Sequence, residues 1–290
     1  MKPGPRKRLP LSFDWEDWFQ LCCPPFDAPE ALDRFECRLP LATDLALELC
    51  EDLGAKATWF CLADQARRHP GLVRRIADAG HAIALHGLTH RRAFELGRAE
   101  FVSGLREAKA LLEDLSGQPV TAFRAPEWSL RGVAEDYWRE LPALGFHIDS
   151  SRVPLAALGD TAWPRRPHHL CEGLWELPPP VLGLGPLKVP LWGWGVRVLP
   201  EPLLRAAIHG LAAEDAGTPL VIHPWELDTG QPGLPEASRG HRFAHGAGLR
   251  RCGQRLRRLW RGLELVPLER WVAEAEAASL PALMPAPRPV

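Results

Sequence analysis

The sequence predicts an α/β fold built on parallel strands, because short apolar segments alternate with segments of helical periodicity along most of its 290 residues. Residues 57–62 and 220–222 are the clearest short apolar runs, as expected of buried strands. Residues 100–115 are the clearest helix, because apolar side chains recur on one face: Phe101, Leu105, Ala108, Leu112 and Leu115. Single α/β barrels commonly reach this length.

The remaining elements follow from the same two patterns. Strands are expected at the other short apolar runs, at residues 9–14, 81–85, 120–123, 146–148, 175–177 and 265–266. Helices are expected where apolar residues return at helical spacing, at about residues 45–53, 70–80, 133–144, 202–213, 249–261 and from 269. Gly54, Gly80 and Gly117 stand where three of these helices should end.

Composition limits the classes of function. No compositional break marks a linker, so we expect one domain over residues 1–280 and a loose, Pro-rich tail over 281–290. The net charge of −1 gives no electrostatic argument for binding nucleic acid or a membrane surface. No apolar run approaches the roughly 20 residues needed to span a bilayer. The basic start has no apolar segment before Asp14, so we expect no signal peptide and a cytoplasmic location.

Polar residues follow five of the predicted strands directly: Asp14, His86, Arg124, Asp149 and His223. In a parallel barrel the carboxyl ends of the strands meet at one face, where active sites are built. We therefore expect these five side chains to lie close together, although they span two hundred residues of sequence.

The histidines of His86-Gly-Leu-Thr-His90 are four residues apart and can both reach one metal ion. The spacing alone is a weak signal, and the position at the end of a predicted strand favours metal binding. A second pair with the same spacing, His241 and His245, follows no strand and is expected in a surface loop.

The segment Asp14-Trp-Glu16-Asp17 offers three carboxylates in four residues. In an extended chain Asp14 and Glu16 face one side and Asp17 faces the other. One carboxylate could complete a metal site with the two histidines, and another could act as a base. Alternatively, Glu16 and Asp17 could lie at the N-terminus of a helix that runs through Gln20.

Arg124 and His223 complete the list of candidates. Arg124 could hold an aspartate through a bidentate pair, or it could make a surface ion pair worth little. A lone histidine such as His223 is more often structural, but an acid is needed opposite the base, which favours a catalytic role.

Together these residues resemble the NodB-type polysaccharide deacetylases, a family of metal-dependent carbohydrate esterases. The matching segments run in family order from Leu11 to about Pro232: SFDWEDWF, ATWFCLADQARRHPGLVRRIADAGHAIALHGLTH, SGQPVTAFRAPEWSL, GFHIDSS, GLWELPP and VIHPWELDTGQP. The D-x-E-D start and the late H-P-W-E-L-D are most similar to the branch associated with exopolysaccharide synthesis. The resemblance implies a distorted (β/α) barrel with fewer than eight strands.

The resemblance also implies roles for individual residues. Asp14 would be the catalytic base, oriented by Arg124, and His223 the general acid, tuned by Asp149. His86 and His90 would bind a divalent metal, most simply zinc. Trp15 stands where the family has a second, metal-binding aspartate, so Glu16 is the expected third ligand, with Asp17 as the alternative. The walls of the sugar pocket would be Trp128, Leu177 and Trp225.

The implied reaction removes N-acetyl groups from amino sugars and releases acetate. The substrate would be an N-acetylated saccharide, either a polymer or a lipid- or nucleotide-linked precursor. Two alternatives are a related barrel hydrolase that opens a small cyclic amide or ureide, and an inactive module that binds sugar.

Overall fold

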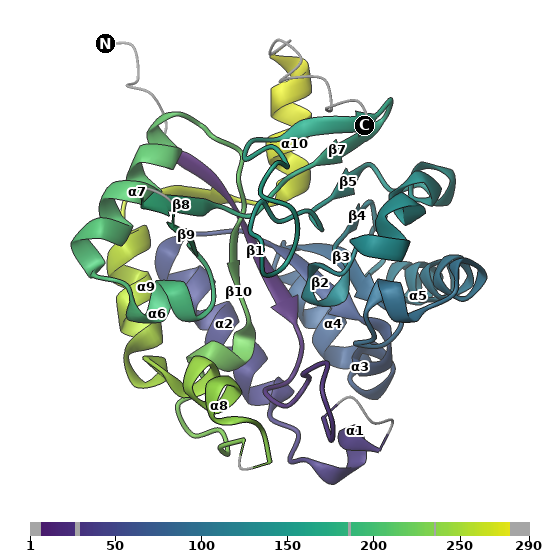
Figure 1. The fold of residues 1–290 in the computed structure, drawn as a ribbon, viewed down its shortest axis with the longest axis horizontal. Helices are drawn as coiled ribbons and strands as arrows, with labels where there is room; N and C mark the ends of the chain where they lie inside the picture. The colour runs from purple at the N-terminus through teal and green to yellow at the C-terminus, as the bar shows by residue number, and fades with distance from the viewer. Residues whose placement is uncertain (1–6, 27–29, 185–186, 235, 279–290) are drawn as a thin grey trace.

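The computed structural model describes residues 7–26, 30–184, 187–234 and 236–278 (Figure 1). The predicted tail over 281–290 therefore lies outside the described residues, and the single domain over 1–280 stays a prediction. In the described part of the chain, no helix is both long enough and apolar enough to cross a membrane. The seven cysteines, all of them among the described residues, form no disulfide bonds with one another.

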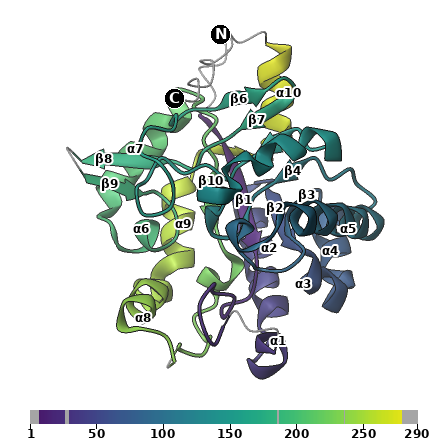
Figure 2. The ribbon, with the colours of Figure 1, turned by 45° about the vertical axis from the view of Figure 1, so that its right-hand side comes forward.

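A curled sheet of nine strands forms the centre of the molecule (Figures 1 and 2). Its strands lie in the order β10 (Leu220–Ile222), β1 (Arg8–Trp15), β2 (Thr58–Leu62), β3 (Ala82–Gly87), β4 (Ala122–Phe123), β5 (Ile148–Asp149), β7 (Leu174–Glu176) and β6 (His168–Cys171). The ninth strand, β11 (Glu264–Val266), pairs with the first half of β1. Among the described strands of this sheet, only β6 runs antiparallel to its neighbour. Leaving out β6 and β11, the order contains seven parallel strands, so the prediction of a distorted barrel with fewer than eight strands is confirmed.

Helices cover the outside of this sheet (Figure 1). They are α2 (Leu39–Leu53), α3 (Ala63–Arg68), α4 (Pro70–Asp78), α5 (Arg98–Ser116), α7 (Glu201–Ala213) and α9 (Cys252–Trp260). Gly54 and Gly117 end α2 and α5 in the left-handed conformation, with φ of 60° and 66°, which glycine adopts without steric cost. The helix α10 (Leu268–Ala277) contributes Trp271 to the apolar cluster inside the barrel.

Some smaller elements were not predicted from the sequence, and one was predicted as a different type of element. Short helices form at α1 (Ala31–Arg34), α6 (Trp194–Val198) and α8 (Arg239–Gly246), and β8 (Val181–Leu184) pairs with β9 (Leu187–Pro190) as a hairpin. The predicted helix over 133–144 is instead two 3₁₀ segments, Gly132–Glu140 and Pro142–Leu144. Pro142 cannot donate a backbone hydrogen bond, so a continuous α-helix through it is disfavoured.

Side chains alternate along β1, and this alternation decides which of them reach the barrel interior. Leu11, Phe13 and Trp15 belong to the core between sheet and helices. Asp14 and Glu16 belong to the other face, because successive strand residues point to opposite sides. The Trp15 side chain is fully buried, and its Nε1 donates to Oγ1 of Thr43 on α2, 2.8 Å away. The position at which the family has a second aspartate therefore faces the helices in this chain.

We predict that Trp15→Asp destabilises the fold without adding a ligand. It removes a large buried ring and buries a carboxylate among apolar side chains, at a cost above about 4 kcal/mol. Trp15→Phe keeps most of the packing and should cost about 1–2 kcal/mol. Chemical denaturation measures both values, and parental stability of Trp15→Asp would contradict this account of β1.

Candidate active site

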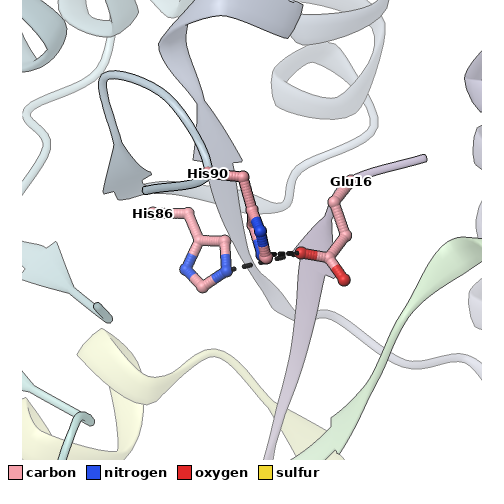
Figure 3. Close-up of side chains that lie close together, drawn as sticks. All are labelled: Glu16, His86 and His90. Carbon is pink, nitrogen blue, oxygen red and sulfur yellow. Dashed lines mark ion pairs between the residues drawn. The ribbon is translucent and has the colours of Figure 1, made fainter. Parts of the chain in front are cut away.

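One oxygen of Glu16 and one nitrogen each of His86 and His90 lie within 4.8 Å of one another. In Figure 3 both imidazole rings point toward the carboxylate, which comes from the end of β1. The distance from Glu16 Oε2 is 2.7 Å to His90 Nε2 and 3.6 Å to His86 Nε2. All three side chains are nearly inaccessible to solvent.

The backbone after β3 and two hydrogen bonds set the direction of the imidazole rings. Gly87 has a φ of 131°, and a Cβ there would lie 3.0 Å from the carbonyl oxygen of Thr89, so only glycine fits this turn. Nδ1 of His86 lies 2.8 Å from the carbonyl oxygen of Arg124, to which it can donate. Nδ1 of His90 lies 3.3 Å from Sγ of Cys22. Since both Nδ1 atoms have protein partners, both Nε2 atoms are left to face Glu16.

This set of donor atoms fits a catalytic divalent metal. Two imidazole nitrogens and one carboxylate oxygen leave further coordination positions for water and substrate. The anchoring of each Nδ1 is the outer support that metal-binding histidines usually have. Burial opposes the charge of Glu16, yet His90 and His223 hold its carboxyl pKa well below the usual value. Glu16 therefore offers an ionised oxygen to a cation bound next to the two rings.

Asp17, the alternative to Glu16, is not part of this group. Its carboxylate accepts the backbone N–H groups of Trp18, Arg38 and Leu39, at 2.9, 2.8 and 3.1 Å. Arg38 and Leu39 stand at the start of α2, so Asp17 satisfies N–H groups that the helix leaves without intrahelical partners. It faces away from the histidines, as the two-residue period of an extended chain predicts.

Asp14 and Arg124 form a buried ion pair beside the three ligand atoms. Nη1 of Arg124 donates to Oδ1 of Asp14, and neither side chain is more than 3% exposed. The pair has a single hydrogen bond rather than the bidentate form expected from sequence, because Nε and Nη2 donate to the backbone and hydroxyl of Ser150. The alternative of a surface ion pair is excluded by this burial. Oδ2 of Asp14 lies 3.9 Å from Nε2 of His223.

His223 lies opposite Asp14, at the end of β10, and its acidic partner is Glu226. Nδ1 of His223 lies 2.8 Å from Oε1 of Glu226, and its Nε2 lies 3.6 Å from Oε1 of Glu16. Burial alone would lower the pKa of His223, but the carboxylates of Glu16 and Glu226 raise it to about 9. Glu226 was not among the residues predicted from the sequence, although a glutamate three residues after the N-cap residue, here His223, has the spacing of a capping box.

The expectation that Asp149 tunes His223 is wrong, because the carboxylate next to Nδ1 of His223 is that of Glu226. Asp149 accepts a hydrogen bond from Ser151 and lies beside Glu176, its neighbour in the register of β5 and β7. Burial raises the pKa of Asp149 to about 6, and burial together with the charge of Asp149 raises the pKa of Glu176 further above its usual value. These two buried carboxyl groups therefore influence each other, and the carboxylate that contacts His223 is Glu226.

A cavity of about 610 Å³ opens beside His223, and its walls include the predicted Trp128 and Trp225 together with Trp192. The predicted wall residue Leu177 is not among them: it is fully buried and belongs to the same apolar cluster as Trp175 and Trp271. The resemblance, and not the pattern of residues, had placed Leu177 in the wall of the pocket.

The prediction of a surface loop around His241 and His245 is also wrong. Both lie on α8, and His245 is buried with its ring stacked on Trp225 at a centroid distance of 4.3 Å. Nε2 of His245 lies 2.9 Å from the carbonyl oxygen of Trp18. His245 therefore supports the wall of the cavity from behind.

The raised pKa of His223 predicts a pH-dependent stability for the metal-free protein. Between pH 6.5 and about 9 the folded His223 keeps a proton that the unfolded chain loses, so the free energy of unfolding should fall as pH rises through this window. Urea denaturation after chelator treatment measures this slope. Glu16→Gln removes the first attracting charge and should flatten it, whereas a parental slope of zero would contradict the assigned contacts.

Two family models match different parts of this chain. Residues 28–147 match the polysaccharide deacetylase model, and residues 150–273 match a domain of unknown function, DUF3473. His86 and His90 fall in the first region, and His223 and Glu226 fall in the second. Strands from both regions pair with β1, so the two matched regions build one sheet and one site.

Two curated relatives are similar in sequence to part of this chain. A peptidoglycan-N-acetylglucosamine deacetylase of Bacillus cereus is 29% identical over 94 residues, which are 32% of this chain and 34% of that protein. A peptidoglycan deacetylase of Helicobacter pylori is 25% identical over 125 residues, which are 43% of this chain and 42% of that protein. The chain thus spans well under half the length of these relatives.

Among solved structures, a candidate polysaccharide deacetylase from Mycobacterium smegmatis has the same fold. It aligns with 100% of this chain over 97% of its own length, with a TM-score of 0.66 and 18% identity. The family model matched over residues 28–147 and the curated relatives show that this chain is similar to the polysaccharide deacetylase family, and the solved structure shows that it shares their fold.

Proposed function

We propose that this protein is a metal-dependent hydrolase that removes N-acetyl groups from amino sugars of a polysaccharide or glycan precursor. The observation that carries the proposal is the convergence of Glu16, His86 and His90 next to Asp14 and His223. A metal site with a carboxylate on one side and an imidazole on the other has the parts that amide hydrolysis needs. The names of the curated relatives support an N-acetylated saccharide as substrate.

Glu16, His86 and His90 would hold the ion, and their two nitrogens and one oxygen favour zinc among the common divalent metals. When bound, the ion would supply Lewis-acid stabilisation of the charge that develops on the acetyl carbonyl oxygen. The cytoplasmic location expected from the sequence remains part of this proposal.

The protein residues would then move two protons. Asp14 takes a proton from the attacking water through Oδ2, because Oδ1 is held by Arg124. Nε2 of His223 gives a proton to the nitrogen of the leaving amino sugar. Acetate and a free amine result. Trp128 and Trp225 would hold the sugar ring against the cavity wall, since aromatic rings provide large, rigid apolar surfaces.

Acetate release tests the proposal. The zinc-loaded protein should release acetate from N-acetylglucosamine oligomers, and His86→Ala should lower this rate more than about 100-fold, since even partners outside the ligand set often contribute 10–100-fold. The matched control is His147→Ala, which removes an exposed imidazole from a loop. An enzymatic acetate assay and metal analysis give both readouts.

Three outcomes separate the alternatives. Acetate release that persists in His86→Ala would contradict the metal-dependent mechanism. Opening of a cyclic amide or ureide, with no acetate from the oligomers, would favour the related barrel hydrolase. Saccharide binding without metal or turnover would favour an inactive binding module.

A further inference from the structure

We propose that Glu226 and Arg197 are positioning residues that hold His223 in the orientation needed to protonate the leaving amine. The inference rests on the proposed function and goes beyond it, because it gives a role to residues in the region matched only by a domain of unknown function. Neither residue touches the reacting atoms. They act through the imidazole of His223.

The Glu226 carboxylate contacts His223 twice. It is fully buried, and its Oε1 accepts the backbone N–H of His223 at 3.1 Å and faces Nδ1 of the same residue at 2.8 Å. Both contacts arise because His223 and Glu226 bracket the first turn of the 3₁₀ segment η5 (Pro224–Leu227). A hydrogen bond to Nδ1 fixes the ring and leaves Nε2 to face Asp14 and Glu16, at 3.9 and 3.6 Å.

Arg197 neutralises the second oxygen of this carboxylate. Nε of Arg197 lies 2.7 Å from Oε2 of Glu226, and the two side chains are 2% and 0% exposed. This contact is an ion pair and not a hydrogen bond, since neither of the two atoms has a hydrogen-bond partner among the described residues. Burying two charges is costly unless they are paired and their other groups are satisfied, so this pair points to a selected function rather than to stability alone.

The end of helix α8 fixes Arg197 in turn. Its Nη1 donates to the carbonyl oxygens of His245 and Ala247 at 2.6 and 2.8 Å, and its Nη2 donates to that of Ala244 at 2.8 Å. Carbonyl groups at the end of a helix lack intrahelical partners and carry partial negative charge. The guanidinium is therefore held by α8 on one side and by Glu226 on the other.

Stacking on Trp225 also restrains the imidazole ring of His223. The rings of His223 and Trp225 are 5.3 Å apart at an angle of 24°, and Trp225 stacks in turn on His245. His223 is thus restrained at Nδ1 by Glu226 and at its face by Trp225. A ring fixed in both ways can deliver a proton from Nε2 to a leaving group in the cavity without first reorienting.

The test compares two leaving groups. An amine must be protonated to leave, whereas 4-nitrophenolate leaves without a proton, so general-acid catalysis matters far more for an N-acetylglucosamine oligomer than for 4-nitrophenyl acetate. In the zinc-loaded protein, Glu226→Gln should lower kcat for the oligomer about 100-fold, and the ratio of amide to ester activity should fall at least 10-fold. KM for the oligomer should change much less than kcat.

A second variant controls for destabilisation of the fold. Glu226→Gln leaves the buried guanidinium of Arg197 without its counter-charge, which can destabilise the fold. The double variant Glu226→Gln/Arg197→Met removes both charges and should show the same fall in the activity ratio. Zinc content and circular dichroism confirm that each variant is loaded and folded.

Equal losses on the amide and the ester would overturn the inference, because a merely structural role affects both. A larger change of the ratio in Asp149→Asn than in Glu226→Gln would also overturn it and return the role to Asp149. A parental protein that hydrolyses neither substrate would overturn the proposed function itself, and the inference with it.

Discussion

The direction of the side chains at the end of β1 is the constraint on which the rest of the site depends. A strand residue and its second neighbour share a face, so the strand that carries Asp14 to the barrel interior also carries Glu16 there. The same rule sends Trp15 to the helix-covered face, where it packs in the core and bonds to Thr43. A shift of one residue in the register of β1 would exchange these roles and remove both carboxylates from the site.

The site is also defined by charges that the fold holds away from water. Arg124 pairs with Asp14, and Arg197 pairs with Glu226, and all four side chains are at most 3% exposed. Pairs buried this deeply rarely add stability, because the loss of hydration offsets most of their attraction. Their arrangement gives two opposed groups, a carboxylate held by one arginine and an imidazole held through a carboxylate by the other. The three atoms suited to a metal lie beside these two groups.

Much of the fold and the central part of the site could be predicted from the sequence. The apolar runs located the parallel strands, and the rule that their carboxyl ends meet at one face brought together Asp14, His86, Arg124 and His223. For Asp149 this rule did not predict the contact partner. That residue also ends a strand, but the strand next to it supplies Glu176, and the two carboxyl groups engage each other. The position of a residue at the end of a strand therefore does not predict which neighbouring side chain it contacts.

The missed features depend on short-range geometry and on distant packing. Glu226 reaches His223 only because a 3₁₀ turn begins there, and Arg197 reaches Glu226 only because α6 packs against the end of α8. The stretch that forms α8 contains two glycines and three charged or imidazole side chains in its first half, so its sequence favoured a loop. Leu177 was placed in the pocket by resemblance, whereas its side chain belongs to the apolar cluster of the barrel interior.

The central claim is that Glu16, His86 and His90 form one metal site, and a crystal structure of the zinc-loaded protein with anomalous data at the zinc edge tests it most directly. The account predicts one anomalous peak within about 2.0–2.2 Å of a Glu16 oxygen and of the Nε2 atoms of His86 and His90. Asp17 should remain bonded to the start of α2. A peak coordinated by Asp17, or a bound ion that contacts only one of the two histidines, would contradict it.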